Sequence, residues 1–221
     1  TETMKQKFSE SKDVIFTEFI IDDDKKINVA FVDGMINSEI VDNSILKPLV
    51  QGADFQTAKN EKEIIDLIMI GTVYHCQRKL RDTLTDCYHD LLSGSVLLIF
   101  DNSEQAVTFE TKGFEKRGVS EPSNENVLKG SKEAFVEVLR INTAIIRRRI
   151  PSDDLIISQQ IAGQRTHTAI AVVYMKGIAN QSIVDEIKKR INKINVDGIV
   201  SLGLIESYLK DSKYSLFPQV L

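Results

Sequence analysis

The sequence predicts an α/β (α+β) fold with two similar subdomains, each a small mixed β-sheet flanked by helices. Two observations predict this fold. One pattern, a strand followed by a glycine, an asparagine and an apolar-periodic segment, occurs near both ends of the chain, and a stretch with few apolar residues lies between the two copies. A chain of 221 residues, 42% of them apolar, is long enough for two such subdomains with buried cores.

The two copies of the pattern align without a gap. Residues 29–42 read VAFVDGMINSEIVD, and residues 172–185 read VVYMKGIANQSIVD. In each copy the glycine permits the turn out of the strand, the asparagine caps the following helix, and an Ile-Val pair begins the buried stripe of that helix. We favour internal duplication over chance recurrence. The matching pairs are Phe31/Tyr174, Gly34/Gly177, Asn37/Asn180, Ile40/Ile183, Val41/Val184 and Asp42/Asp185.

A β-hairpin precedes the glycine in each copy. The paired stretches are residues 14–21 with 26–32 and residues 155–162 with 168–175. After the first copy the sequence predicts a helix over 38–47 stopped by Pro48, a loop over 51–60, a helix or strand over 61–70, a strand over 72–77, a helix over 81–92, and a hairpin of 95–100 with 105–110. After the second hairpin it predicts helices over 182–193 and 201–211.

The subdomain boundaries follow from the composition between the copies. Residues 1–111 form the predicted N-terminal subdomain, and residues 112–130, with glycines, a proline and mixed charge, form a connector. Residues 131–221 form the predicted C-terminal subdomain. It begins with a long helix over 131–147, whose apolar residues recur every three or four positions and which Pro151 closes.

Composition and motifs argue against several function classes. The formal net charge of −4 argues against a nucleic-acid binder, and no apolar run approaches the ~20 residues that span a membrane. The sequence has no Gly-rich phosphate loop and no nucleophile–base motif, so we expect neither an enzyme nor a cofactor. Cys76 and Cys87 are expected to be free thiols in a reducing compartment, and their spacing is not that of a metal site.

Three consecutive arginines, residues 147–149, are the sharpest charge feature of the sequence. One interpretation is an anchor for a carboxylate, a phosphate or an acidic partner. The other is structural, with a helix-end arginine bridging to an acidic residue of the connector. The residues proposed for binding or for contacts between the lobes are Arg117, Glu121, Glu125, Asn142, Arg147, Arg148 and Arg149, and none is proposed for catalysis or for a metal.

One long segment of the sequence carries a family resemblance. It reads GFEKRGVSEPSNENVLKGSKEAFVEVLRINTAIIRRRI, and the chain then ends in SLFPQVL. Both stretches resemble the GerA family, the A subunits of bacterial spore germinant receptors, in which the second stretch precedes the membrane part. Ser131 departs from the family pattern, where proline is frequent, but both residues suit a helix start. The matching residues are Arg117, Val119, Glu121, Pro122, Glu125, Val127, Gly130, Lys132, Glu133, Phe135, Glu137, Asn142, Arg147, Arg148 and Arg149.

The resemblance implies the soluble N-terminal domain of a germinant receptor A subunit, which contributes to nutrient sensing, signal relay and receptor assembly in spore germination. It implies B and C subunits as partners and a place at the spore inner membrane, with this domain on the cytoplasmic (spore core) side and a membrane part that follows residues 217–219. A homo-oligomer and a small nutrient ligand are further expectations. The alternative is a module that binds a sugar or an amino acid directly, in a pocket between the two lobes.

Overall fold

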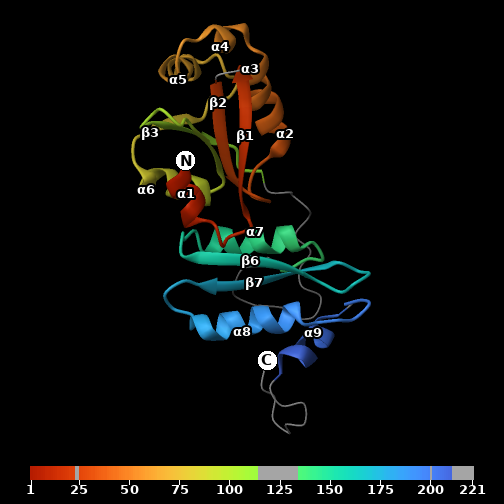
Figure 1. Ribbon diagram of the computed structural model, residues 1–221. Coiled ribbons are helices and arrows are strands. Elements are labelled where there is room, and N and C mark those ends of the chain that lie inside the picture. The colour runs from red at the N-terminus through yellow and green to blue at the C-terminus, as the bar shows by residue number, and fades with distance from the viewer. Residues whose placement is uncertain (23–24, 114–133, 200, 211–221) are drawn as a thin grey trace, which may run out of the picture. The chain divides into compact units, whose positions relative to one another are not determined.

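The computed structural model describes residues 1–22, 25–113, 134–199 and 201–210 (Figure 1). The chain divides into two compact units, Thr1–Asp153 and Asp154–Leu221. The fold is the mixed arrangement of helices and sheets that the sequence predicts, and every pairing between the described strands is antiparallel. The division lies after Asp153, whereas the sequence placed the junction at residues 112–130, most of which lie outside the described residues.

Unit 1 is built on a five-stranded sheet with the order β1-β2-β4-β5-β3. Both predicted hairpins of this unit are confirmed, but residues 72–77 are not a strand, and the edge strand β3 lies just after them. The strands are β1 (Val14–Asp22), β2 (Lys25–Val32), β3 (Arg78–Arg81), β4 (Ser95–Ile99) and β5 (Ala106–Glu110).

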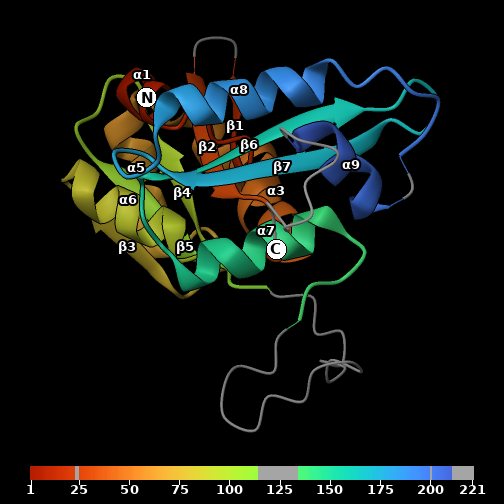
Figure 2. The same ribbon diagram turned by 90° about the horizontal axis from the view of Figure 1, so that it is seen from below.

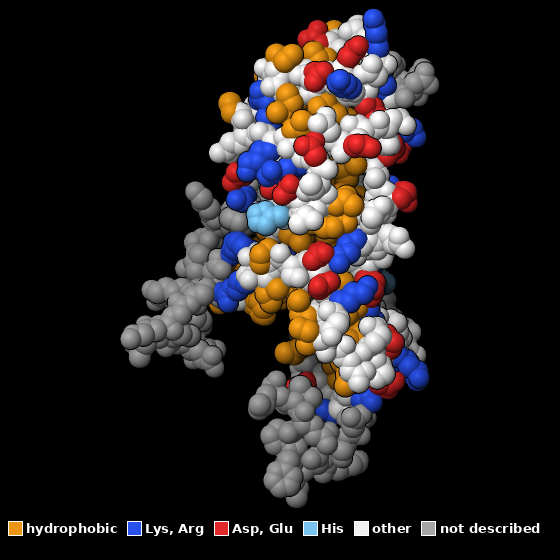
Figure 3. All heavy atoms as spheres, turned by 90° about the vertical axis from the view of Figure 1, so that its left-hand side faces the viewer, with side chains coloured by type: hydrophobic (Ala, Val, Ile, Leu, Met, Phe, Trp, Pro, Cys, Tyr) orange, Lys and Arg blue, Asp and Glu red, His pale blue; other side chains and the backbone are white. Residues whose placement is uncertain are grey.

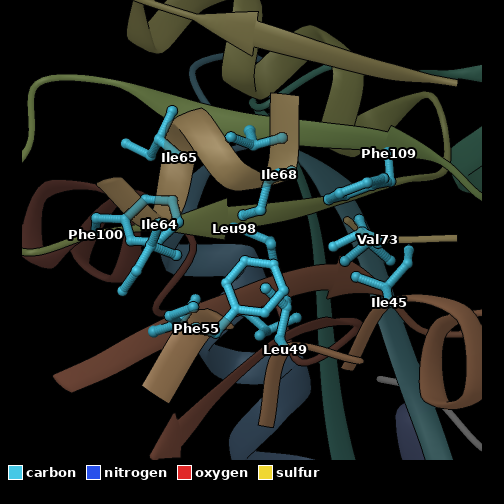
Figure 4. Close-up of a cluster of buried hydrophobic side chains, with 14 of the residues drawn as sticks. Ile45, Leu49, Phe55, Ile64, Ile65, Ile68, Val73, Leu98, Phe100 and Phe109 are labelled. Carbon is cyan, nitrogen blue, oxygen red and sulfur yellow. The ribbon is translucent and has the colours of Figure 1, made fainter. Parts of the chain in front are cut away.

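Both faces of this sheet are buried. Successive side chains of a strand point to opposite faces, so Val29 and Leu98 belong to one core while Ala30 and Leu97 belong to the other. The first core lies under helices η1 (Val41–Leu46), α3 (Lys47–Gln51), α4 (Ala53–Thr57) and α5 (Glu61–Ile70), and Figure 4 shows its side chains converging. The second lies under helices α1 (Glu2–Lys7), α6 (Leu84–Leu92) and α7 (Leu139–Arg149).

The helical segment after β2 differs from the prediction. It begins with α2 (Ser38–Ile40), but it does not stop at Pro48: η1, which is π-helical, and α3 follow without a break. Pro48 is the second residue of α3 and lies directly after the π-helical turns of η1. Residues 53–57, predicted as loop, form α4 because the side chain of Phe55 is fully buried in the first core.

Helices α5 and α6 begin and end on side chains that the sequence shows. The Asn60 side chain accepts a hydrogen bond from the backbone N–H of Glu63, and Gly71 closes α5 with a positive φ of 115°, which settles residues 61–70 as a helix. Thr83 caps α6 in the same way. Within α6, burial opposes ionisation of Asp90, but hydrogen bonds from Arg81 and Thr108 hold the pKa of this carboxyl below its usual value.

Unit 2 is a two-stranded sheet covered on one face by helices. Its hairpin consists of β6 (Leu155–Ala162) and β7 (Thr168–Met175), with the bounds that the sequence predicts. Helix α8 (Gln181–Asn192) runs lengthwise along the hairpin, as Figure 2 shows, and α9 (Leu202–Leu209) packs beside it. Their apolar side chains, with Ile170 and Val172 of β7, form the core of this unit.

The repeated pattern has the same local structure in both units. Asn37 Oδ1 accepts a hydrogen bond from the backbone N–H of Ile40, and Asn180 Oδ1 accepts one from that of Ser182. The two glycines, Gly34 and Gly177, have φ values of 79° and 82°. The predicted hairpin–glycine–capped helix unit is therefore present at both ends of the chain.

The two repeated glycines should differ in their tolerance of a side chain. Gly177→Ala meets no atom within 4 Å, so only its positive φ should destabilise unit 2, by about 1–2 kcal/mol. Gly34→Ala should destabilise unit 1 by roughly 1–3 kcal/mol more, because its Cβ would lie 3.0 Å from the carbonyl oxygen of Arg140. Hydrogen exchange at increasing urea concentrations measures the loss of unfolding free energy in each unit. Equal losses for the two variants would contradict this account.

Candidate functional site

The candidate site is the end of helix α7, where the arginine cluster lies. The helix is shorter than predicted: it starts at Leu139, the described residues 134–138 before it are not helical, and residues 131–133 lie outside the described part of the chain. The Asn142 side chain holds the approach to the helix, because it accepts a hydrogen bond from the backbone N–H of Val136 at 2.8 Å and donates one to the Val136 carbonyl at 2.7 Å.

Helix α7 packs closely on unit 1. The turn at Gly34 lies so near the helix that an added Cβ would be 3.1 Å from the Cβ of Ala144, which itself is buried in the second core. On the surface, Arg140 Nη1 lies 3.5 Å from a carboxylate oxygen of Asp33. This packing places α7 in unit 1, whereas the sequence assigned the helix to the C-terminal subdomain.

Arg147 is the centre of the site and is fully buried. Its Nε and Nη2 donate hydrogen bonds of 2.8 and 3.0 Å to the two carboxylate oxygens of Asp13, and its Nη1 donates one of 2.8 Å to the Ser152 carbonyl. Asp13, just before β1, is itself 2% exposed. Such a two-pronged contact between a guanidinium and a carboxylate is strong and specific in geometry.

The segment that leaves α7 is held to unit 1 at two successive residues. Arg147 binds the carbonyl of Ser152, and Lys7 Nζ lies 2.9 Å from a carboxylate oxygen of Asp153. The hydrogen bond from Lys7 lowers the pKa of Asp153. These contacts fix the path of the chain up to the last residue of unit 1.

The seven predicted site residues therefore divide into three groups. Arg117, Glu121 and Glu125 lie outside the described residues. Asn142 and Arg147 bind groups of unit 1, and the partner of Arg147 is Asp13. Arg148 is half-buried and Arg149 is exposed. Sequence reasoning missed Asp13, because its partner lies 134 positions away and no local pattern marks it.

A polar hollow lies elsewhere in unit 1, beside the start of α5. Side chains of both charges line it, and two pairs of them hydrogen-bond with each other: Asn102 with Glu61, and Gln105 with Asp82. These bonds tie the β4–β5 turn to its neighbours. The lining residues are Lys25, Ala58, Lys59, Asn60, Glu61, Lys62, Asp82, Asn102, Ser103, Glu104 and Gln105.

The two cysteines occupy different environments. Cys87 is buried among the apolar side chains of the second core, as its place on the apolar face of α6 predicts, and burial raises the pKa of its thiol to about 11. Cys76 is exposed. Among the described residues, no three His, Cys, Asp or Glu side chains converge as metal ligands would.

Two surface properties bear on partners. On the face shown in Figure 3, Lys and Arg side chains lie among Asp and Glu side chains. In the described part of the chain, none of the helices combines the length and the apolar character needed to cross a membrane.

Comparison with known proteins gives a consistent result. A family model described as the Bacillus/Clostridium GerA spore germination protein matches residues 2–221. Spore germination protein B1 of Bacillus subtilis is 30% identical over 221 residues, which are all of this chain and 45% of that protein. Spore germination protein KA of the same organism is 29% identical, over 97% of this chain and 39% of that protein.

A solved structure has the same fold. It is the N-terminal domain of the A subunit of the Bacillus megaterium spore germinant receptor GerK3, with a TM-score of 0.65 and 24% identity. The match covers 93% of this chain and 72% of that structure. The chain spans less than half the length of the curated relatives B1 and KA.

Removal of one partner of the buried ion pair should destabilise unit 1 strongly. Arg147→Met or Asp13→Leu alone should cost about 3–5 kcal/mol, because either leaves a buried charge uncompensated. The double variant should recover most of this loss. The matched control is Arg140→Met on the same helix, whose ion pair with Asp33 is about half exposed and should contribute less than about 1 kcal/mol. Urea unfolding measures all four variants, and a double variant no more stable than the singles would contradict a coupled pair.

The two thiols should react at very different rates. With a pKa of about 11, Cys87 is almost entirely protonated at pH 8, and its side chain is also buried, so iodoacetamide should label only Cys76 in the folded protein. Both should react in denaturant. Peptide mass spectrometry after brief alkylation distinguishes the two, and labelling of both cysteines in the folded chain would contradict the buried position of Cys87.

Proposed function

Because this chain belongs to the GerA family of spore germination proteins, we propose that it is the N-terminal domain of a germinant receptor A subunit that relays a nutrient signal to the rest of the receptor. The observation that carries the relay is the clamped exit of unit 1. Arg147 and Lys7 hold Ser152 and Asp153, and β6 of unit 2 begins at Leu155. A displacement of α7 would therefore reach unit 2 through very few residues.

The partners and the location are part of the same proposal. We propose that the domain assembles with B and C subunits at the spore inner membrane and lies on the cytoplasmic side. Two facts support this setting. The relatives are more than twice as long as this chain, and one of them, YfkQ of Bacillus subtilis, is named a membrane protein. Its match covers 94% of this chain and 40% of that protein at 28% identity.

The alternative, direct binding of a sugar or an amino acid, has weaker support. Arg147 is one of the residues expected to bind such a ligand, but its side chain donates hydrogen bonds to Asp13 and to the Ser152 carbonyl. The polar hollow of unit 1 does not replace it, since Asn102 and Gln105 of its lining bind neighbouring acidic residues. We therefore rank relay and assembly above direct binding.

The relay is tested by loosening the exit of unit 1 in the full-length protein. A Gly-Ser insertion between Ile150 and Pro151 should abolish nutrient-triggered germination while the amounts of the A, B and C subunits in spores stay normal, because unit 2 then no longer follows α7. The matched control is the same insertion between Ser103 and Glu104, in the β4–β5 turn, which should leave germination unchanged.

Germination is followed by loss of spore refractility, and subunit amounts by immunoblot. Normal germination with the insertion after Ile150 would overturn the relay. Saturable binding of a nutrient to the isolated chain by calorimetry would favour the alternative. Failure of the B and C subunits to copurify with the unaltered protein would remove the assembly role.

A further inference from the structure

The turn of the β6–β7 hairpin is bound to the loop that precedes helix α9. The successive backbone N–H groups of Gln164 and Arg165 donate hydrogen bonds of 2.8 Å to two successive carbonyls of this loop. Figure 1 and Figure 2 both show the turn beside the loop within unit 2. The turn, residues 163–168, and the loop, residues 195–199, together form what we call the latch of unit 2.

Thr166 is the side chain at the centre of the latch. Its Oγ1 accepts a hydrogen bond of 3.1 Å from the backbone N–H of Ile199 and lies 2.9 Å from the hydroxyl oxygen of Thr168. The Thr168 oxygen in turn lies 3.0 Å from the Ile199 carbonyl oxygen. The two hydroxyls of the turn therefore bind both backbone groups of Ile199, whose side chain is buried in the core of unit 2.

Two glycines pack against the Thr166 side chain. A Cβ on Gly163 would lie 2.5 Å from Thr166 Oγ1, and one on Gly198 would lie 2.8 Å from the methyl carbon Cγ2. Real Cβ atoms essentially never approach another atom so closely, so turn and loop meet at a distance that requires glycine. His167 in the same turn has a φ of 46°, a conformation that a non-glycine residue keeps only where its surroundings fix it.

Helix α9 depends on the latch because its own packing is modest. None of its residues is fully buried, and those that face the core of unit 2 are only partly buried against it. Its end is held by a hydrogen bond of 2.6 Å from Arg190 Nη1 to the Leu209 carbonyl. Its first residue, Leu202, lies three positions after Ile199. The latch therefore fixes the place at which α9 begins.

The latch also lies on the path that the proposed relay requires. Strand β6 begins at Leu155, two positions after Asp153, whose carboxylate is bound by Lys7. The same strand ends at Ala162, next to the first residue of the latch. A displacement at the exit of unit 1 thus reaches the latch along a single strand.

We propose that the latch couples the β6–β7 hairpin to α9, so that a displacement of the hairpin moves the start of α9 and, with it, the receptor segments that follow this domain. Thr166 is the positioning residue of this coupling. The inference rests on the proposed function, because it names the route by which the relay leaves unit 2. Its failure is distinguishable, since the insertion between Ile150 and Pro151 tests the relay without touching the latch.

A pair of substitutions should open the latch and close it again. Gly198→Ala should open it, because the new Cβ would collide with the Thr166 methyl group, which cannot turn away without loss of the hydroxyl contacts. The φ of Gly198 lies outside the left-handed region, so alanine suits its backbone. Thr166→Ser in the same chain should restore the latch, because serine keeps the hydroxyl and lacks the methyl group.

Hydrogen exchange of the 221-residue chain measures the opening. In Gly198→Ala the amides of Ile199 and of α9 should exchange at least about tenfold faster, and in the double variant they should return to within about threefold of the unaltered chain. The matched control is Gly203→Ala in α9, whose Cβ would meet no atom within 4 Å and which should not speed this exchange.

Germination of spores that carry the full-length protein tests the coupling itself. Gly198→Ala should slow nutrient-triggered germination at least about tenfold at normal amounts of the receptor subunits, and addition of Thr166→Ser should restore it. Unchanged exchange in Gly198→Ala, no recovery in the double variant, or normal germination with an open latch would each overturn the proposal.

A second variant keeps the test decisive if Gly198→Ala does not fold. Thr166→Val retains the shape of the side chain but lacks the hydroxyl that accepts the hydrogen bond from Ile199. It should speed the exchange of the Ile199 amide and slow germination in the same way. An unchanged exchange rate or normal germination in Thr166→Val would overturn the proposal.

Discussion

The guanidinium of Arg147 is fully buried, and a buried cation is stable only where a carboxylate and further hydrogen bonds compensate its lost hydration. Asp13 and the Ser152 carbonyl supply that compensation, and each lies at a place where the chain could otherwise separate from unit 1. The aspartate fixes the entry to β1, and the serine fixes the exit from α7. Closure of the second core by this helix and the direction in which the chain leaves unit 1 thus depend on one side chain.

Much of the fold could be predicted because its signals are local. Asn37 and Asn180 cap helices, both repeated glycines adopt positive φ, and each strand of the three hairpins begins and ends within one residue of the bounds that alternation and turn residues indicate. The errors arose where tertiary packing overrides local preference. Pro48 is a strong stop signal, yet the helical segment continues through it, directly after the π-helical turns of η1. Burial of Phe55 makes a helix of a segment whose composition indicates loop.

The candidate site was predicted in part, and the limit is physical. The sequence marks Arg147 as a candidate, but the next two residues are also arginines. No local signal shows which of the three consecutive arginines faces the interior. Nor does local sequence reveal that a single aspartate before β1 is the partner, because long-range ion pairs depend on the finished packing. Family membership was recognised from a long sequence segment and not from any single residue. The position of helix α7 in unit 1 was shown only by the structure.

The separation of 134 positions between Asp13 and Arg147 has a consequence for the newly made protein. The ribosome releases the N-terminal residues first, so the aspartate emerges long before the arginine does. Until Arg147 emerges, burial of the Asp13 carboxylate in its native position would leave it without a counter-ion. The second core of unit 1, to which Ala144 of α7 contributes, can therefore close only after this helix has left the ribosome.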